Sequence, residues 1–220
     1  MNAFNFEQAR HNMIEQQIRT WNVLDEDVLN LLKLLPREDF VPAKFKDHAF
    51  TDMCIPLGHG QEMLPPKVEA YMMQALQVQP EESVLEVGTG SGYVTALLAS
   101  MAGHVISVDI DPETQQEAAA KIEAHNINNV SFEVGDAALG WDKHQPYDVI
   151  VITGSLPILP ENFQRSLNVG GRLFAIVGDA PAMDVLLITR VKENEWTHQV
   201  LFETNVPPLI NAPEPERFAL

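Results

Sequence analysis

The hydrophobic pattern divides most of the chain into alternating strands and helices. Short apolar runs rich in Val, Ile and Leu are mostly followed by longer stretches in which apolar residues recur every three or four positions. This alternation is typical of parallel strands joined by helices that cover both faces of the sheet. The pattern predicts strands at 83–87, 104–109, 130–134, 147–153 and 171–177, and helices at 91–101, 112–125 and 159–166.

Both ends of the chain follow other patterns. Two β-branched runs at 184–191 and 196–204 predict an antiparallel pair added at the sheet edge. The tail at 207–220 is rich in proline and acidic residues, so we expect it to lie extended on the surface. Near the N-terminus, amphipathic helices are predicted at 9–20, at 25–35, where Asp25 is a suitable N-cap, and at 67–76.

A glycine-rich turn follows the strand at 83–87. Residues 84–92 read V-L-E-V-G-T-G-S-G, and glycines at alternate positions let the backbone pass close to a ligand. A dinucleotide fingerprint would need a glycine at position 93, which is Tyr93, and no Gly-Lys-Ser/Thr triplet forms a P-loop. The remaining pattern, E-x-G-x-G-x-G, resembles the first motif of S-adenosylmethionine-dependent methyltransferases.

Acidic residues follow two further strands. Asp109 stands about 20 residues after the glycine turn, where a carboxylate can accept both hydroxyls of a ribose, whereas Asp111 before Pro112 is assigned as a helix cap. Asp136 resembles the acid that meets the adenine amino group, although Gly-Asp is also a common turn. The candidate cofactor residues at this rim are Glu86, Gly88, Thr89, Gly90, Gly92, Asp109, Ile110, Asp136, Ala137 and Thr153.

Composition narrows the class of protein. With 220 residues and 45% hydrophobic content, the chain can bury one full-sized core. We see no signal-peptide pattern and no membrane span, and therefore expect a cytoplasmic protein without a membrane partner. Cys54 is the only cysteine and the seven histidines form no ligand pair, so no metal site is predicted.

The net charge also bears on the substrate. The chain carries 14 basic and 31 acidic residues, a net charge of −17. Because affinity for nucleic acid depends largely on Lys and Arg neutralising phosphates, a nucleic-acid substrate is disfavoured. The sequence makes no prediction of the oligomeric state.

Segments outside the glycine turn narrow the resemblance to one family. Taken together, they resemble the protein-L-isoaspartate O-methyltransferases over about 200 residues. The resemblance implies a Rossmann-like α/β fold with a parallel central sheet, an antiparallel edge addition and an N-terminal helical cap. It divides the chain into a cap with the substrate loop at 1–80 and a methyltransferase domain at 81–220. The segments are M-I-E-Q-Q-I-R, L-P-R-E-D-F-V-P, D-x-x-I-P-L-G-H-G-Q, G-D-A-A-L-G-W, P-Y-D-V-I-V-I-T-G and V-G-G-R-L.

The implied activity is repair methylation of isoaspartyl residues in damaged proteins, with S-adenosylmethionine as the cofactor. A carboxylate with a pKa near 4 is already ionised at neutral pH, so it needs no general base to attack a methyl group. The sequence therefore predicts no certain catalytic residue. The candidates for the substrate loop are His59, Gln61, Glu62 and Leu64.

One segment departs from the family pattern. Where the family reads G-Q-T-I-S-x-P, residues 60–66 read G-Q-E-M-L-P-P, so both hydroxyls are lost and Glu62 adds a negative charge. Two like charges about 5 Å apart repel by roughly 3 kcal/mol at an effective dielectric constant near 20. Two alternatives therefore stay open beside the family activity. One is a methyltransferase of the same fold with another substrate, and the other is a cofactor-binding protein without catalysis.

Overall fold

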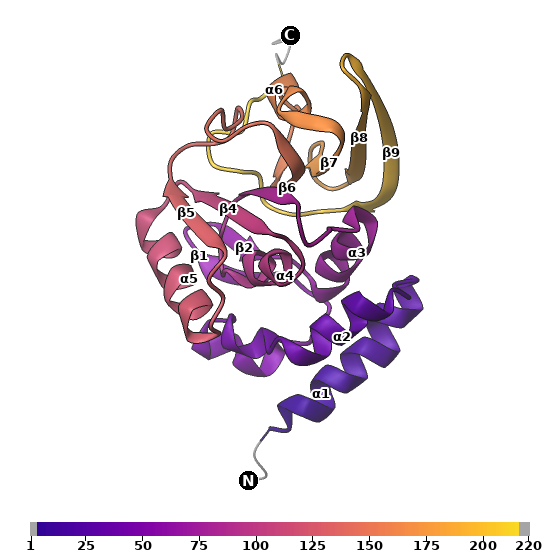
Figure 1. Ribbon diagram of the computed structural model, residues 1–220. Coiled ribbons are helices and arrows are strands. Elements are labelled where there is room, and N and C mark those ends of the chain that lie inside the picture. The colour runs from indigo at the N-terminus through magenta and orange to yellow at the C-terminus, as the bar shows by residue number, and fades with distance from the viewer. Residues whose placement is uncertain (1–3, 216–220) are drawn as a thin grey trace.

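The computed structural model describes residues 4–215 and shows a central sheet flanked by helices (Figure 1). Its seven strands are β3 (Ser83–Val87), β4 (His104–Asp109), β5 (Val130–Val134), β6 (Tyr147–Leu156), β7 (Leu167–Val177), β8 (Met183–Lys192) and β9 (Glu195–Thr204). They lie in the order β5-β4-β3-β6-β7-β8-β9. The first five pair in parallel, and β8 pairs antiparallel with both β7 and β9, which confirms the predicted sheet and its edge addition.

The crossover helices lie where the pattern places them. They are α4 (Tyr93–Met101), α5 (Pro112–Ala124) and α6 (Glu161–Arg165). Asp111 caps α5 by accepting the backbone N–H of Glu113 at 3.0 Å, as predicted. Among residues 4–215, no helix combines the length and apolar content that crossing a membrane requires.

The N-terminal region supplies helices and a small hairpin. The helical elements are α1 (Phe6–Met13), η1 (Ile14–Ile18), η2 (Arg19–Trp21), α2 (Glu26–Leu34), η3 (Arg37–Asp39), η4 (Ala43–His48) and α3 (Pro66–Leu76). The first begins before the predicted residue because the Asn5 side chain caps it, and Asp25 caps α2 as expected. Strands β1 (Ile55–Gly58) and β2 (Gln61–Met63) form an antiparallel hairpin that the hydrophobic pattern did not predict.

Side-chain alternation along the strands builds two hydrophobic cores. In β3, Val84 belongs to the core that contains α3, α4 and the N-terminal helices, whereas Leu85 and Val87 belong to the core beneath α6. Residues two apart in a strand share a face, so Glu86 points to the same side as Val84, toward α4. This orientation decides the role of Glu86 at the site.

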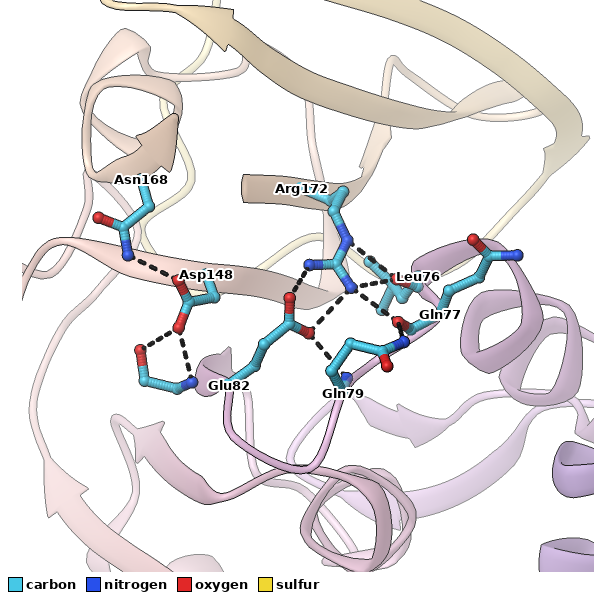
Figure 2. Close-up of polar contacts among 8 residues, drawn as sticks. Leu76, Gln77, Gln79, Glu82, Asp148, Asn168 and Arg172 are labelled. Carbon is cyan, nitrogen blue, oxygen red and sulfur yellow. Dashed lines mark hydrogen bonds and ion pairs between the residues drawn. The ribbon is translucent and has the colours of Figure 1, made fainter. Parts of the chain in front are cut away.

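A polar network joins the helical cap to the sheet (Figure 2). Arg172 of β7 donates to the carbonyls of Leu76 and Gln77, at the C-terminal end of α3, and pairs with Glu82 at 2.5 Å. Glu82 in turn accepts the backbone N–H of Gln79 at 2.8 Å. A guanidinium at the last carbonyls of a helix also complements the helix dipole. The network therefore fixes α3, and with it the hairpin that precedes α3, relative to the sheet.

The C-terminal segment corrects the prediction of a surface tail. After β9 the chain turns back across the sheet to β6, where Pro208 forms a bridge with Ser155 (Figure 1). The backbone of Leu209 donates to the Ser155 carbonyl at 2.9 Å, and Val206 is buried. Residues 207–209 are thus bound to β6 and the chain turns at Ile210 and Asn211, whereas the last part of the predicted tail, 216–220, lies outside the described residues.

Candidate functional site

A cavity opens at the carboxyl ends of the parallel strands. It encloses about 960 Å³ including its open mouth, a size that suits a cofactor. Its walls come from the β1–β2 hairpin, the loops that follow β3, β4 and β5, the end of β6, and the C-terminal segment. The predicted site residues that line it are His59, Gln61, Glu62, Leu64, Gly88, Gly90, Asp109, Ile110, Asp136, Ala137 and Thr153.

The glycine turn brings bare backbone to the cavity wall. Gly88 has φ +93°, and a Cβ there would collide with the hydroxyl of Thr153, which donates to the Gly88 carbonyl at 2.6 Å. Gly92 has φ +83° and faces α5 instead of the cavity. A Cβ at this position would stand 3.0 Å from the Cβ of Ala118 in α5. The first glycine thus clears space at the cavity, whereas the last lets α4 and α5 pack closely.

Glu86 and Thr89 do not line the large cavity. Glu86 is fully buried, and its Oε2 accepts the hydroxyls of Thr95 at 2.5 Å and Ser107 at 2.6 Å. Thr89 shares a hydrogen bond of 2.7 Å with the same Ser107 hydroxyl. Burial raises the pKa of Glu86 to about 8, so this carboxyl is largely neutral at pH 7. In this structure Glu86 ties β3 to α4 and β4 beneath the turn.

Asp109 has the geometry that a ribose needs. One carboxylate oxygen accepts the backbone N–H of Gly90 and the other that of Asp111, each at 3.0 Å. Each oxygen therefore keeps a lone pair, and the half-buried carboxylate lines the cavity. Two neighbouring hydroxyls can bind such a carboxylate, so the residues present fit the ribose of S-adenosylmethionine.

Asp136 stands farther along the same rim. Its Oδ1 accepts the backbone N–H of Ala138 at 3.0 Å, and its Oδ2 accepts the side-chain amide of Asn211 at 2.8 Å. The C-terminal segment is thereby attached to the position predicted for the adenine amino group. Ile110 and Ala137 supply apolar wall on this side, which suits a purine ring.

The β1–β2 hairpin forms the opposite wall. Its tip, residues 58–60, has positive φ at all three positions, including +51° at His59. His59 stands close enough to the rim to contribute to the lowered pKa of Asp111, after the larger effects of the Thr114 hydroxyl and the Glu113 N–H. The hairpin therefore faces the cofactor rim, as a substrate loop must.

Glu62 lies on the cavity wall beside Cys54. Burial, followed by the charge of Glu62, raises the pKa of the Cys54 thiol to about 12, so the thiol stays protonated. Glu62 itself is exposed and ends at the cavity. No lysine or arginine lines this cavity in the part of the chain that the structure describes. The field at the site is therefore negative, which favours a cationic ligand.

Sequence reasoning missed several residues of the cavity. Leu57 comes from the unpredicted hairpin, Cys54 directly precedes it, and the C-terminal segment adds Val206, Leu209 and Ile210. Leu209 packs over the glycine turn, because a Cβ at Gly154 would lie 2.8 Å from its Cδ2. The only local signal was an apolar residue within the proline-rich tail.

Comparison with known proteins identifies the family of this chain. The model of the protein-L-isoaspartate(D-aspartate) O-methyltransferase family matches residues 8–212. Protein-L-isoaspartate O-methyltransferase 1 of Rhodopseudomonas palustris is 38% identical over 97% of this chain and 90% of its own length. The Magnetococcus marinus protein-L-isoaspartate O-methyltransferase is 35% identical over 93% of this chain and 89% of its own.

A solved structure extends the likeness to the fold. A Plasmodium falciparum protein described as a protein-L-isoaspartate O-methyltransferase, in complex with S-adenosyl-L-homocysteine, superposes with a TM-score of 0.77. It is 18% identical and covers 94% of this chain and 99% of its own. Because the family model and both curated relatives span nearly the whole chain, the chain belongs to the protein-L-isoaspartate(D-aspartate) O-methyltransferase family, whose cofactor is S-adenosylmethionine.

Proposed function

We propose that this protein transfers a methyl group from S-adenosylmethionine to the free carboxylate of isoaspartyl residues in damaged polypeptides. The observation that carries the proposal is one continuous cavity between the rim of Asp109 and Asp136 and the hairpin of residues 58–64. A cofactor held at the rim and a peptide held at the hairpin would meet inside it. Family membership supplies the identity of the acceptor.

The chemistry asks the protein for positioning rather than for proton transfer. The cofactor supplies a methyl group on a positively charged sulfur, and a carboxylate oxygen of the substrate displaces that sulfur. Because the carboxylate is ionised at neutral pH, its lone pair is available without a base. Holding the two reactants in line and excluding water accounts for the rate, and the hairpin and the C-terminal segment enclose the cavity for that purpose.

We assign the predicted residues to two groups within this function. Gly88, Gly90, Asp109, Ile110, Asp136, Ala137 and Thr153 would hold the cofactor, and His59, Gln61, Glu62 and Leu64 would face the peptide or the reacting end of the cofactor. Glu86 and Gly92 would support the turn from behind, whereas Thr89 lines a smaller pocket beside the main cavity. Residues 1–80 would then act as the cap with the substrate loop, and 81–220 as the methyltransferase domain.

We propose the chemical class of the substrate from the charge of the protein and of the cavity wall. With a net charge of −17 and no basic side chain among the described residues of the cavity wall, a polypeptide acceptor is favoured over a nucleic acid. A cytoplasmic location without a membrane partner stays a prediction from the sequence.

The test is transfer of labelled methyl groups from S-adenosylmethionine to an isoaspartyl peptide. The matching aspartyl peptide serves as the control, and base-labile release of methanol identifies a carboxyl methyl ester. We expect labelling of the isoaspartyl peptide alone. Calorimetric binding of the cofactor without labelling of either peptide would refute the proposal and leave the altered-substrate or non-catalytic alternative.

A further inference from the structure

A smaller pocket adjoins the main cavity at the glycine turn. It encloses about 270 Å³, and its wall includes Ser91 and Val94 from the start of α4. It shares Leu57, Glu62, Leu64, Gly88, Gly90 and Thr153 with the main cavity, whereas Asp109 and Asp136 line only the main one. An adenosyl ligand with its ribose at Asp109 and its adenine toward Asp136 therefore has this side pocket left for its amino-acid end.

The carboxylates around the side pocket differ in what they can still bind. Glu69 is fully buried and forms a bidentate pair with Arg37, at 2.9 Å and 3.2 Å. Glu86 is buried, bonded to two hydroxyls and absent from both pocket walls. Glu62 is exposed, lines both spaces and accepts the Cys54 thiol, a neutral donor that leaves its charge uncompensated. Among the described residues, Glu62 is therefore the acidic side chain that combines a free charge with a place on the wall of the side pocket.

The amino-acid end of the cofactor carries a matching charge. It is a zwitterion whose α-ammonium group needs an acceptor and whose carboxylate needs donors. No lysine or arginine among the described residues lines the side pocket, whereas the N-terminus of α4 opens on it and favours an anion. An ammonium group in a site of net negative charge gains a charge-assisted hydrogen bond from a carboxylate.

We infer that Glu62 binds the α-ammonium group of S-adenosylmethionine. This inference rests on the proposed function. It adds a cofactor contact that the glycine motif does not supply, because the acid of that motif, Glu86, is buried behind the turn. It also gives a reason for the departure from the family pattern. Once the ammonium group neutralises Glu62, the substrate carboxylate no longer meets an unpaired negative charge beside the cofactor.

The test measures cofactor binding, not turnover. Isothermal calorimetry gives the Kd of three ligands for the wild type, Glu62→Gln and the control Glu81→Gln, whose exposed carboxylate lies outside both pockets. The ligands are S-adenosylhomocysteine, its deaminated analogue, which keeps the carboxylate, and methylthioadenosine, which lacks the amino-acid end. We expect Glu62→Gln to weaken S-adenosylhomocysteine about tenfold or more and to leave the other two within twofold.

Each other outcome is informative. Unchanged affinity for S-adenosylhomocysteine in Glu62→Gln would overturn the inference, and so would equal weakening of all three ligands, which would indicate a disturbed fold. A wild type that binds none of the ligands would overturn it as well. Failure of peptide methylation with the expected calorimetry would refute the proposed function alone, whereas methylation with unchanged Kd values would refute this inference alone.

Discussion

Replacing Glu86 by glutamine should stabilise the protein at neutral pH. The carboxyl is fully buried, and burial raises its pKa from an ordinary value of 4.5 to about 8. Between these two values the folded protein keeps the proton and the unfolded chain releases it. Rising pH therefore favours unfolding, and the stability present below pH 4.5 is lost as the pH rises toward 8.

The magnitude follows from the shift. One pKa unit corresponds to about 1.4 kcal/mol, so the wild type should lose roughly 1.4 kcal/mol per pH unit in this interval, and roughly 5 kcal/mol over all of it. Glutamine stays neutral and can still accept the hydroxyls of Thr95 and Ser107. Its amide N–H group would occupy the place of Oε1, which has no partner among the described residues. Burying this N–H group without an acceptor lowers the free energy of unfolding of the variant equally at every pH, so the slope of its pH profile is unchanged.

Urea unfolding at pH 5, 6, 7 and 8, followed by tryptophan fluorescence, measures the free energy of unfolding of the wild type and of Glu86→Gln at each pH. The free energy of unfolding of Glu86→Gln minus that of the wild type should increase steadily with pH. Glu81→Gln, which removes an exposed carboxylate, should track the wild type. Parallel profiles for Glu86→Gln and the wild type would refute the assignment of a neutral buried carboxyl. The Kd for S-adenosylhomocysteine should change less than threefold, because Glu86 does not line the cavities.

Three further changes test other parts of the structure. Arg172→Ala should lower the free energy of unfolding by about 2 to 3 kcal/mol, because it removes the polar network at the end of α3. As a control, Arg165→Ala removes an exposed arginine and should lower it by less than about 0.5 kcal/mol in the same urea titration. Asp109→Asn should weaken S-adenosylhomocysteine about 10- to 100-fold in calorimetry, and should lower the free energy of unfolding by about 1 to 2 kcal/mol, because its amide NH₂ would face one of the two backbone N–H groups that the carboxylate accepts. Gly88→Ala should abolish cofactor binding, since its Cβ collides with Thr153 in a backbone conformation that alanine rarely adopts; retained binding would contradict the geometry.

The sheet was predictable because its signal is local. Each parallel strand is an apolar run, Asp109 ends β4 and Asp136 lies two residues after β5, so the chain order alone places both acids at the carboxyl edge. The alternation of side chains along a strand also predicts where Glu86 points. It puts Glu86 on the face of Val84, toward α4, and so indicates a buried side chain rather than a ligand at the rim.

The hairpin and the C-terminal segment depend on contacts that no local pattern encodes. Strand β2 has three residues, too few to show alternation, and its partner is fixed by a turn of residues with positive φ. Leu209 is held by Ser155, more than fifty positions earlier in the chain. A proline-rich stretch looks the same whether it lies in solvent or pairs with a distant strand, because its backbone donors can be satisfied either way.

The proposed reaction brings a negatively charged substrate into a negatively charged cavity. Asp109, Asp136 and Glu62 line the main cavity together, with no lysine or arginine beside them among the described residues. A substrate carboxylate entering this field alone would be repelled. When bound, the cofactor would bring a sulfonium and an α-ammonium group, two positive charges against its own single carboxylate, and would so weaken the negative field of the wall. We therefore expect the cofactor to bind before the peptide, and the sulfonium charge that attracts the acceptor disappears when the methyl group is transferred.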